Sequence, residues 1–477
     1  MILHEELLIN GVFLGGPCDS SIAKDIATSP YDGARVGVAA EATWSEADAA
    51  IDAATRAFLP WSRTSRAERR KFLLDCAQAI GEHKDELCQL MALEIGKPVD
   101  VAAAEVDRGV ITFELAAAWL AEDEWEAIDV SMDPRSDGVA VQTRREAIGP
   151  ILCITPYNWP VNLAAHKIAP ALAAGNTIVL KGSGQAALCT LRLARILQSV
   201  GLPNGVLNAL HCEPEIAEKV ATDPRIKMVS FTGSEKVGWH LKEKCWDKRV
   251  ALELGGTASV YVHRDVDPSA IADKLAVSAF TYAGQICIST QTIYAHFDIY
   301  DALRESLIEA TTKIKADDPR KSGVICGPVI DSKSAERIES WVKGSGGTVL
   351  AGGGRVKTLM EPTLLESPNP NSNAVSQEIF GPVLNLQRVD VLSIALLELA
   401  RSPYGINHAV FTHSNEVVDQ FLKFVPCGGV IVNDVPSLRF DAMPYGGVKR
   451  SGFGREGVRY AIEEMTELRA VVRRTLP

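Results

Sequence analysis

Five short apolar segments between residues 151 and 256 constrain the fold of this chain more than any other feature. They read ILCIT, TIVLK, VLNAL, KMVSFTG and RVALELGG, and helical stretches or turns such as GLPNG separate them. Apolar runs of this length are typical of strands buried on both faces, as in a parallel sheet. Strand, helix, strand at this spacing indicates right-handed crossover units. We therefore expect an α/β fold whose parallel sheet is covered by helices on both sides.

The segment before these strands is expected to be mostly helical. Ser45 is predicted to cap one helix, with Asp48 as the third residue after it. A longer helix is predicted over residues 66–95, because apolar residues recur there at helical spacing and GKP follows at 96–98.

Strand signals also occur elsewhere. Residues 125–146 alternate apolar and polar positions on both sides of an Asp-Gly turn, which predicts a β-hairpin. A second region of alternating helices and strands runs from Pro268 to about residue 425, and the C-terminal ELRAVVRRTLP reads as an edge strand. This strand could pair with the hairpin of another subunit, which would make the protein an oligomer.

Composition limits the class of protein and its partners. The chain has 477 residues, which is long enough for two or three hydrophobic cores. Its composition, 47% apolar and 23% charged, is that of a soluble protein. No apolar run approaches the roughly 20 residues that span a bilayer, and the N-terminus lacks a basic targeting segment. We therefore expect a cytoplasmic protein with no membrane partner. The net charge of −11 and the lack of a Lys/Arg stripe argue against nucleic acid.

Ten cysteines are scattered along the chain without a CxxC pair, which predicts free thiols, no disulfides and no metal site. Most free cysteines are small core residues, and Cys76 and Cys153 lie in apolar patterns of that kind. Cys287, in YAGQICIST, instead follows a helical stretch (269–283) and Gly284, at the head of a strand. A cysteine at such a boundary is a candidate nucleophile, and its reactivity depends on the residues around it.

Other residues at strand ends are candidates for binding or catalysis. Gly233 and Ser234, in FTGSEKVG, stand where a strand turns into a helix, a position suited to a phosphate. Asn158, in TPYNWPVN, could donate to an oxyanion or be a turn residue. Glu253 ends a buried strand, where a carboxylate needs either a role or a lysine partner. Lys181 closes TIVLK and could reach a ribose or phosphate, or lie at the surface.

The order of the motifs resembles that of a known family. Eight of them follow one another as in the aldehyde dehydrogenase superfamily: PYNWP, KIAPALAAGN, VLKGS, FTGSEKVG, LELGG, GQICIS, QEIFGPVL and PYGGVKRSGFGREG. The match runs from the helix near residue 45 to the C-terminus. It implies a Rossmann-like cofactor domain, an α/β catalytic domain and an oligomerisation β-hairpin. The implied boundaries are 1–124 and 147–256 with a return of 428–456 for the cofactor domain, 257–427 for the catalytic domain, and 125–146 and 457–477 for oligomerisation.

The resemblance also implies roles for single residues. Cys287 would be the nucleophile and Glu253 the general base. The Asn158 amide and the backbone N–H of Cys287 would form the oxyanion hole, with Lys167 supporting the polar network nearby. The residues implied for the cofactor are Thr155, Lys181, Ser183, Gly233, Ser234, Gly255, Glu378 and Phe380.

The implied reaction is the NAD(P)-dependent oxidation of an aldehyde to its carboxylic acid. A thiolate adds to the aldehyde, hydride leaves for the nicotinamide, and water hydrolyses the resulting thioester with Glu253 as base. A CoA-acylating enzyme would lack this glutamate, and a homologue recruited as a structural protein could have lost the nucleophile or the base. Because Cys287 and Glu253 are both present in this chain, both alternatives are disfavoured.

Departures from the family pattern bear on specificity. The family's VxKP reads VLKG here, and the third residue after Lys181, often a glutamate that binds the ribose of NAD, is Gly184. Since the carboxylate that would repel a 2′-phosphate is missing, we expect NADP to be preferred over NAD. LELGGTAS also replaces LELGGKSP, a change that has no interpretation.

The substrate class rests on few residues. Within the superfamily, the chain most resembles the subgroup of non-phosphorylating glyceraldehyde-3-phosphate, lactaldehyde and phosphonoacetaldehyde dehydrogenases. Arg108 and Arg439 fall where some of these enzymes hold the anion and could clamp a phosphate or carboxylate, although Ile286 replaces a third such arginine. If both arginines are instead solvated or structurally paired, the alternative is a neutral aldehyde or a semialdehyde. Tyr157 could shape an apolar entrance or pack in the core. The expected assembly is a homodimer or homotetramer.

Overall fold

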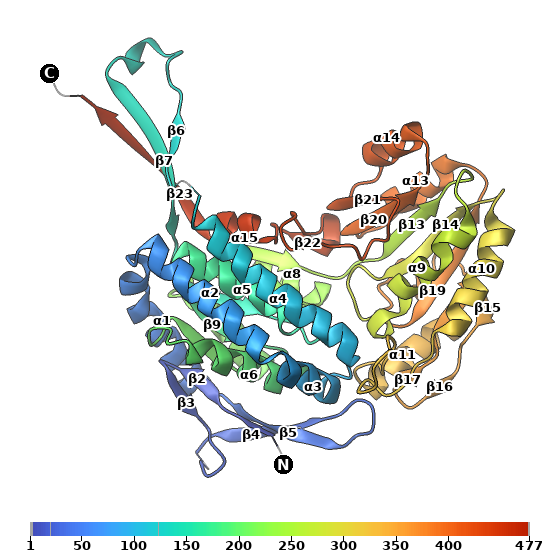
Figure 1. Cartoon of the computed structure of the whole chain (residues 1–477), viewed down its shortest axis with the longest axis horizontal. Helices are drawn as coiled ribbons and strands as arrows, with labels where there is room; N and C mark the ends of the chain where they lie inside the picture. The colour runs from blue at the N-terminus through green and yellow to red at the C-terminus, as the bar shows by residue number, and fades with distance from the viewer. Residues whose placement is uncertain (1–2, 20, 123, 476–477) are drawn as a thin grey trace.

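The computed structural model describes residues 3–19, 21–122 and 124–475, and one of its two large sheets contains the five predicted strands (Figure 1). They are parallel, which confirms the prediction, and their order in the sheet is β12-β11-β8-β9-β10. Their bounds are β8 Pro150–Ile154, β9 Thr177–Lys181, β10 Leu207–Leu210, β11 Met228–Thr232 and β12 Arg249–Glu253. Antiparallel strands complete the edges: β22 Gly452–Phe453 beside β12, and β2 Leu7–Ile9 with β3 Val12–Leu14 beside β10.

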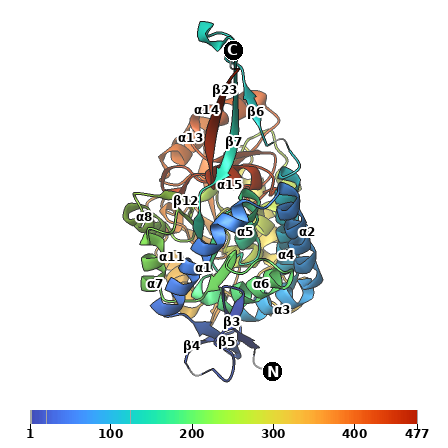
Figure 2. The same ribbon diagram turned by 90° about the vertical axis from the view of Figure 1, so that its left-hand side faces the viewer.

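Helices cover both faces of this sheet (Figure 2). Its strand residues Ile151, Val179 and Val229 are fully buried. On one face α5 and α6 pack beneath α2, α3 and α4, and on the other lie α1, α7 and α8. Their bounds are α1 Trp44–Ser62, α2 Arg66–Glu82, α3 Lys84–Glu94, α4 Val99–Trp119, α5 Asn162–Ala174, α6 Ala187–Ser199, α7 Pro214–Thr222 and α8 Glu235–Lys244.

Helix α1 begins two residues earlier than predicted. Thr43 is its N-cap residue in place of Ser45, and Glu46 completes the capping box in place of Asp48. The Glu46 carboxylate accepts a hydrogen bond from the backbone N–H of Thr43 at 2.9 Å. Both pairs have the spacing of a capping box, so the sequence pattern alone does not separate them.

The helix predicted over residues 66–95 is two helices, because α2 ends at Glu82 and α3 begins at Lys84. Between them, His83 Nδ1 lies 2.8 Å from the carbonyl oxygen of Ala79 and closes the end of α2. Helix α3 then packs against α4 and α6, a tertiary contact that apolar spacing within one segment does not signal.

A second sheet has seven strands in the order β15-β18-β19-β14-β13-β20-β21, and all its pairs except β15–β18 are parallel. Val260 and Val262 of β13 face α9 and α10, whereas Tyr261 between them faces α13 and α14. The bounds are β13 Ala258–Val262, β14 Thr290–His296, β15 Thr348–Ala351, β18 Thr363–Glu366, β19 Val383–Val389, β20 Asn407–Phe411, β21 Gly429–Val432, α9 Pro268–Phe280, α10 Tyr300–Lys313, α13 Leu392–Arg401 and α14 Asn415–Phe424.

Strand β21 belongs to this second sheet, and the chain rejoins the first sheet only at β22. The sequence placed that return at residue 428, before β21. The division of the chain into domains remains a prediction.

The predicted hairpin projects from the body of the molecule (Figure 1). It consists of β6 (Glu126–Ile128) and β7 (Val139–Ala147), which are joined by residues 129–138, including a 3₁₀ helix at Pro134–Ser136, and not by the predicted Asp-Gly turn alone. Strand β23 (Thr466–Arg474) pairs with β7 along its whole length. The expectation that the C-terminal strand pairs with the hairpin of another subunit is therefore wrong. Helix α15 (Val458–Glu464) leads directly into β23 beside the end of β7, so the strand nearest to β23 is β7 of the same chain.

Smaller elements complete the fold. They are the sheet β1 (Leu3–Glu5), β5 (Arg35–Glu41) and β4 (Ala23–Thr28), the pair β16 (Arg355–Val356) and β17 (Leu359–Met360), and helices α11 (Ser332–Lys343) and α12 (Asn373–Ser376). Within the described ranges, no helix combines the length and apolar character needed to cross a membrane.

Candidate active site

Two cavities meet at Cys287. Their volumes are about 580 Å³ and about 260 Å³, and Asn158, Leu163 and Cys287 line both. Cys287 stands between the short helix η3 (Thr281–Gly284) and β14. A group at this position can be approached from both cavities.

The loop before Cys287 has an unusual backbone. Tyr282, Ala283 and Gly284 have φ angles of 51°, 52° and 67°, so the helical stretch predicted over 269–283 ends at Phe280. A Cβ on Gly284 would lie 2.2 Å from a facing carbonyl oxygen, so only glycine fits there. These left-handed residues turn the chain from α9 toward Cys287.

The larger cavity lies at the carboxyl ends of β8, β9, β11 and β12, where open α/β sheets bind ligands. Gly233 and Ser234 stand between β11 and α8, at a helix start suited to a phosphate. All eight residues predicted to contact the cofactor line this cavity: Thr155, Lys181, Ser183, Gly233, Ser234, Gly255, Glu378 and Phe380.

Polar groups in this cavity fit a nicotinamide dinucleotide. Thr155 Oγ1 is buried and has no hydrogen-bond partner among the described residues. Burial lowers the pKa of Lys181, whose ammonium group would be stabilised by a phosphate or ribose oxygens. Glu378 accepts from the backbone N–H of Gly256 at 3.1 Å, and burial raises its pKa to about 7. These groups could hold the ribose and phosphate oxygens of NAD(P).

Tyr157, a candidate on the substrate side, lines the larger cavity and is absent from the lining of the smaller one. Its hydroxyl donates to Gln285 Oε1 at 3.0 Å, and its ring meets Phe380 edge-on at 6.1 Å. Trp159 lines the smaller cavity instead. Tyr157 thus supports the loop before Cys287.

Cys287 Sγ lies 2.9 Å from the hydroxyl oxygen of Tyr445. Burial raises the pKa of the Cys287 thiol to about 12, and the hydrogen bond to Tyr445 opposes this rise. The Asn158 amide donates to the carbonyl oxygen of Gln285 at 2.9 Å, and an amide group carries a second hydrogen that can serve an oxyanion.

Glu253 is the last residue of β12 and is only 5% exposed. Its Oε2 has no hydrogen-bond partner in the part of the chain that the structure describes. Burial, with the nearby charge of Glu456 second, raises the pKa of Glu253 well above its usual value. A Cβ at Gly446 would lie 2.8 Å from its Oε1, so glycine leaves room for this carboxyl.

A buried ionic network lies behind Glu253. Lys167 Nζ is 3.0 Å from Glu456 Oε1 and 3.0 Å from Ser230 Oγ, and Arg439 Nη2 is 3.4 Å from Glu456 Oε2. Burial would raise the pKa of Glu456, but Lys167 and Arg439 outweigh it and lower this pKa to about 2. The pKa values of these two neighbouring carboxyl groups therefore shift in opposite directions, that of Glu253 upward and that of Glu456 downward.

Both arginines proposed to bind an anion line the smaller cavity, and both contact carboxylates. Arg108 binds Asp441 through Nη2 at 2.7 Å and Nε at 3.1 Å, and His166 Nε2 is 2.8 Å from the same carboxylate. Arg439 meets Glu456 at 3.4 Å, stacks on the Tyr445 ring at 3.7 Å, and has a buried Nε without a partner among the described residues.

Sequence reasoning missed Tyr445, Glu456, Asp441 and Gln285 as members of the site. Tyr445 and Glu456 lie in PYGGVKRSGFGREG, a motif that was noted only for its order in the chain. Nothing local distinguishes Asp441, whose contact with Arg108 spans 333 positions.

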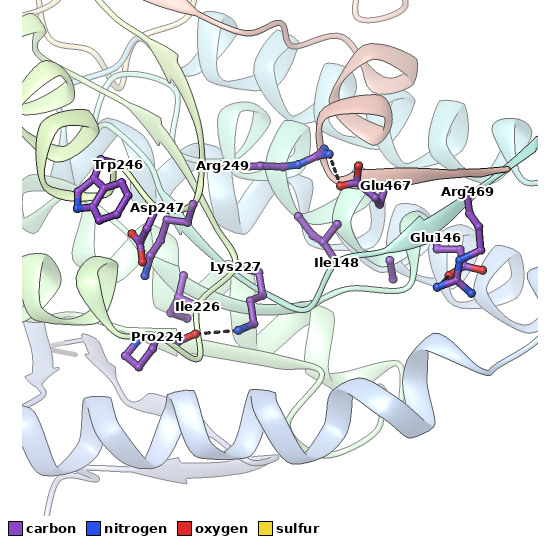
Figure 3. Close-up of a pocket in the computed structure, with 12 residues that line it drawn as sticks. Glu146, Ile148, Pro224, Ile226, Lys227, Trp246, Asp247, Arg249, Glu467 and Arg469 are labelled. Atoms are coloured by element: carbon purple, nitrogen blue, oxygen red, sulfur yellow. Dashed lines mark hydrogen bonds and ion pairs between the residues drawn. The ribbon is translucent and has the colours of Figure 1, made fainter.

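A larger depression, of about 690 Å³, lies at the base of the β7–β23 sheet and contains none of the candidate residues (Figure 3). Its charged side chains are mostly paired: Arg249 with Glu467, and Arg469 with Glu146. Volume alone therefore does not identify the site.

Comparisons with known proteins agree with this arrangement. The model of the aldehyde dehydrogenase family matches residues 20–471. The 3-sulfolactaldehyde dehydrogenase of Priestia aryabhattai is 35% identical over 470 residues, which cover 97% of each chain. The lactaldehyde dehydrogenase of Methanocaldococcus jannaschii is 37% identical and covers 90% of this chain and 92% of its own. The NADP-dependent glyceraldehyde-3-phosphate dehydrogenase of Bacillus halodurans C-125, solved with NADP, is 29% identical with a TM-score of 0.95 and covers 99% of both chains.

Proposed function

The chain belongs to the aldehyde dehydrogenase family, and we propose that it oxidises a small aldehyde that carries an anionic group. It is an oxidoreductase that acts on aldehydes with NAD(P). The proposal that the substrate carries an anionic group rests on one observation. Arg439, in the cavity wall beside the nucleophile, has a buried Nε without an acceptor among the described residues.

The charges around Arg439 support this proposal. Lys167 and Arg439 share a single carboxylate, Glu456, and burial disfavours a charge on the nearby Glu253 by raising its pKa. The group therefore retains one positive charge, and a buried cation is costly unless it is paired. A phosphate, sulfonate or carboxylate on the substrate would supply the missing acceptor. Two relatives are named for such substrates, 3-sulfolactaldehyde and glyceraldehyde 3-phosphate.

The proposed reaction begins at Cys287. Its thiolate adds to the aldehyde carbon, and the oxyanion accepts from the Asn158 amide and the Cys287 N–H. NAD(P) in the larger cavity would supply the hydride acceptor. Glu253 then removes a proton from the water that attacks the thioester on Cys287, which releases the carboxylic acid.

The substrate class is tested by initial rates of NADPH formation from glyceraldehyde 3-phosphate and from glyceraldehyde, which differ only in the phosphate. We expect kcat/KM to favour the phosphorylated aldehyde by about a hundredfold, equivalent to about 2.7 kcal/mol of transition-state binding. Equal values would point to a neutral aldehyde, as the name of the Methanocaldococcus jannaschii relative suggests.

Arg439→Gln is expected to reduce this preference for the phosphorylated aldehyde by about tenfold to a hundredfold, because the charge-assisted hydrogen bond from Nε is lost. The ratio of the two kcat/KM values within one variant cancels general damage to the site. Arg108→Gln is the matched comparison, and a smaller loss is expected because Asp441 already occupies the Arg108 Nε and Nη2. An unchanged ratio in Arg439→Gln would assign the anion to another residue.

For the cofactor, we propose a preference for NADP. Gly184 is exposed, and a side chain there would make only an ordinary contact with His211, at 3.6 Å. Gly184→Glu is expected to lower the ratio of kcat/KM for NADP to that for NAD by about tenfold or more, because like charges placed together are repulsive. Gly184→Gln, of similar size but neutral, should retain the wild-type ratio. Equal ratios in both variants would contradict this role for position 184.

We also propose that the protein is a homodimer or homotetramer in the cytoplasm. Val472 and Leu468 are 65% and 53% exposed on the projecting sheet, and apolar side chains in such a position favour burial against another copy. All ten cysteines are free, as is usual in a reducing compartment.

A further inference from the structure

Tyr445 is in direct contact with the proposed nucleophile, although no step of the proposed reaction uses it. Its hydroxyl oxygen is 2.9 Å from Cys287 Sγ. The ring is only 3% exposed and lies in a small apolar cluster with Ile288 and Ile406. Tyr445 and Cys287 also both line the smaller cavity.

Contacts other than Cys287 fix the position of Tyr445. Its backbone N–H donates to the carbonyl oxygen of Glu456 at 3.0 Å, and its carbonyl oxygen accepts from the Glu456 N–H at 2.7 Å. The Arg439 guanidinium stacks on the ring at 3.7 Å, and Arg439 and Glu456 also contact each other. The hydroxyl is thus held against the sulfur by both its backbone and its ring.

The direction of the hydrogen bond follows from the two groups. A phenol is a good donor, a thiol is a weak one, and a thiolate can only accept. Burial, and then proximity to Cys287, raises the pKa of Tyr445 well above its usual value, so the phenol keeps its proton.

We propose that Tyr445 is a positioning residue that donates its hydroxyl hydrogen to the thiolate of Cys287 and so stabilises the reactive form of the nucleophile. This inference rests on the proposed role of Cys287. A hydrogen bond to a charged group corresponds to about a tenfold to hundredfold change in the ionised fraction. A thiolate of higher pKa is also more nucleophilic, which reduces the expected loss of reaction rate to about threefold to tenfold.

The test is the rate at which iodoacetamide alkylates Cys287 in the full-length protein without cofactor, followed by peptide mass spectrometry between pH 6.5 and 9.5. In Tyr445→Phe we expect the rate at each pH to fall about threefold to tenfold, with the onset of reaction moved to higher pH. Tyr300→Phe is the matched control, because it removes a buried hydroxyl that donates to Glu366, a residue outside both cavities. Alkylation that is the same in Tyr445→Phe and the wild type would overturn the proposal.

A second variant covers the case in which Tyr445→Phe folds poorly or alters access of the reagent. 3-Fluorotyrosine at position 445 keeps the shape of the side chain and is a stronger donor, so the onset of alkylation is expected to move to lower pH. An unchanged onset would indicate a purely structural role and overturn the proposal. If Cys287 of the wild type reacts no faster than the other nine cysteines, its role as nucleophile fails as well, an outcome distinct from failure of Tyr445 alone.

Discussion

Replacing Cys287 with alanine is expected to lower kcat for aldehyde oxidation by about 10⁴-fold or more, because no other group in the two cavities can form the covalent adduct at that position. Cys287 is the cysteine that lines both cavities. The measurement is the steady-state rate of NADPH formation with saturating aldehyde. The dissociation constant for NADP, from the quenching of tryptophan fluorescence, is expected to change little.

The control for this variant is Cys427→Ala. Cys427 is half-buried, as Cys287 is, and lines neither cavity. The activity of Cys427→Ala is therefore expected to stay within about twofold of the wild type. If Cys287→Ala keeps more than about a hundredth of the wild-type rate, a covalent mechanism at this residue is contradicted.

The parts of the fold that could be predicted are those with a local signal in the sequence. The strands were predictable because apolar runs between turn residues are local signals, and β8 to β12 are parallel as expected. The start of α1 was missed because Thr43 and Ser45 have equivalent capping patterns, and the break at His83 because it depends on how α3 packs. The pairing of β23 with β7 of its own chain also depends on tertiary structure.

For the site, the sequence predicted which residues carry chemistry but could not show their surroundings. The candidate cofactor residues gather in one cavity because strand ends of a parallel sheet share an edge. Burial and then the charge of Glu456 raise the pKa of Glu253, and the hydroxyl of Tyr445 contacts the sulfur of Cys287; Glu456 and Tyr445 lie 203 and 158 positions away from these residues. The roles of these residues remain predictions until they are tested.

Replacing Glu253 with glutamine is expected to stop the reaction after its first half. Glutamine has the same shape but cannot take a proton from water, so hydrolysis of the thioester is expected to slow by about 10²-fold to 10⁴-fold. Rapid mixing with aldehyde and NADP should then give a burst of about one NADPH per active site and little turnover afterwards. Intact-protein mass spectrometry should detect the acyl group on Cys287.

The pH dependence of this step provides a second test. Burial and Glu456 raise the pKa of Glu253 well above its usual value, so its carboxylate forms at higher pH than that of an ordinary glutamate. A base acts in its ionised form, so hydrolysis by the wild type is expected to accelerate as pH rises through this pKa, and Glu253→Gln should lose that acceleration. Glu378→Gln, which alters a carboxyl in the larger cavity, is expected to lower turnover without accumulation of acyl-enzyme. If Glu253→Gln shows neither the burst nor the adduct, Glu253 acts before hydride transfer, and another group must activate the water.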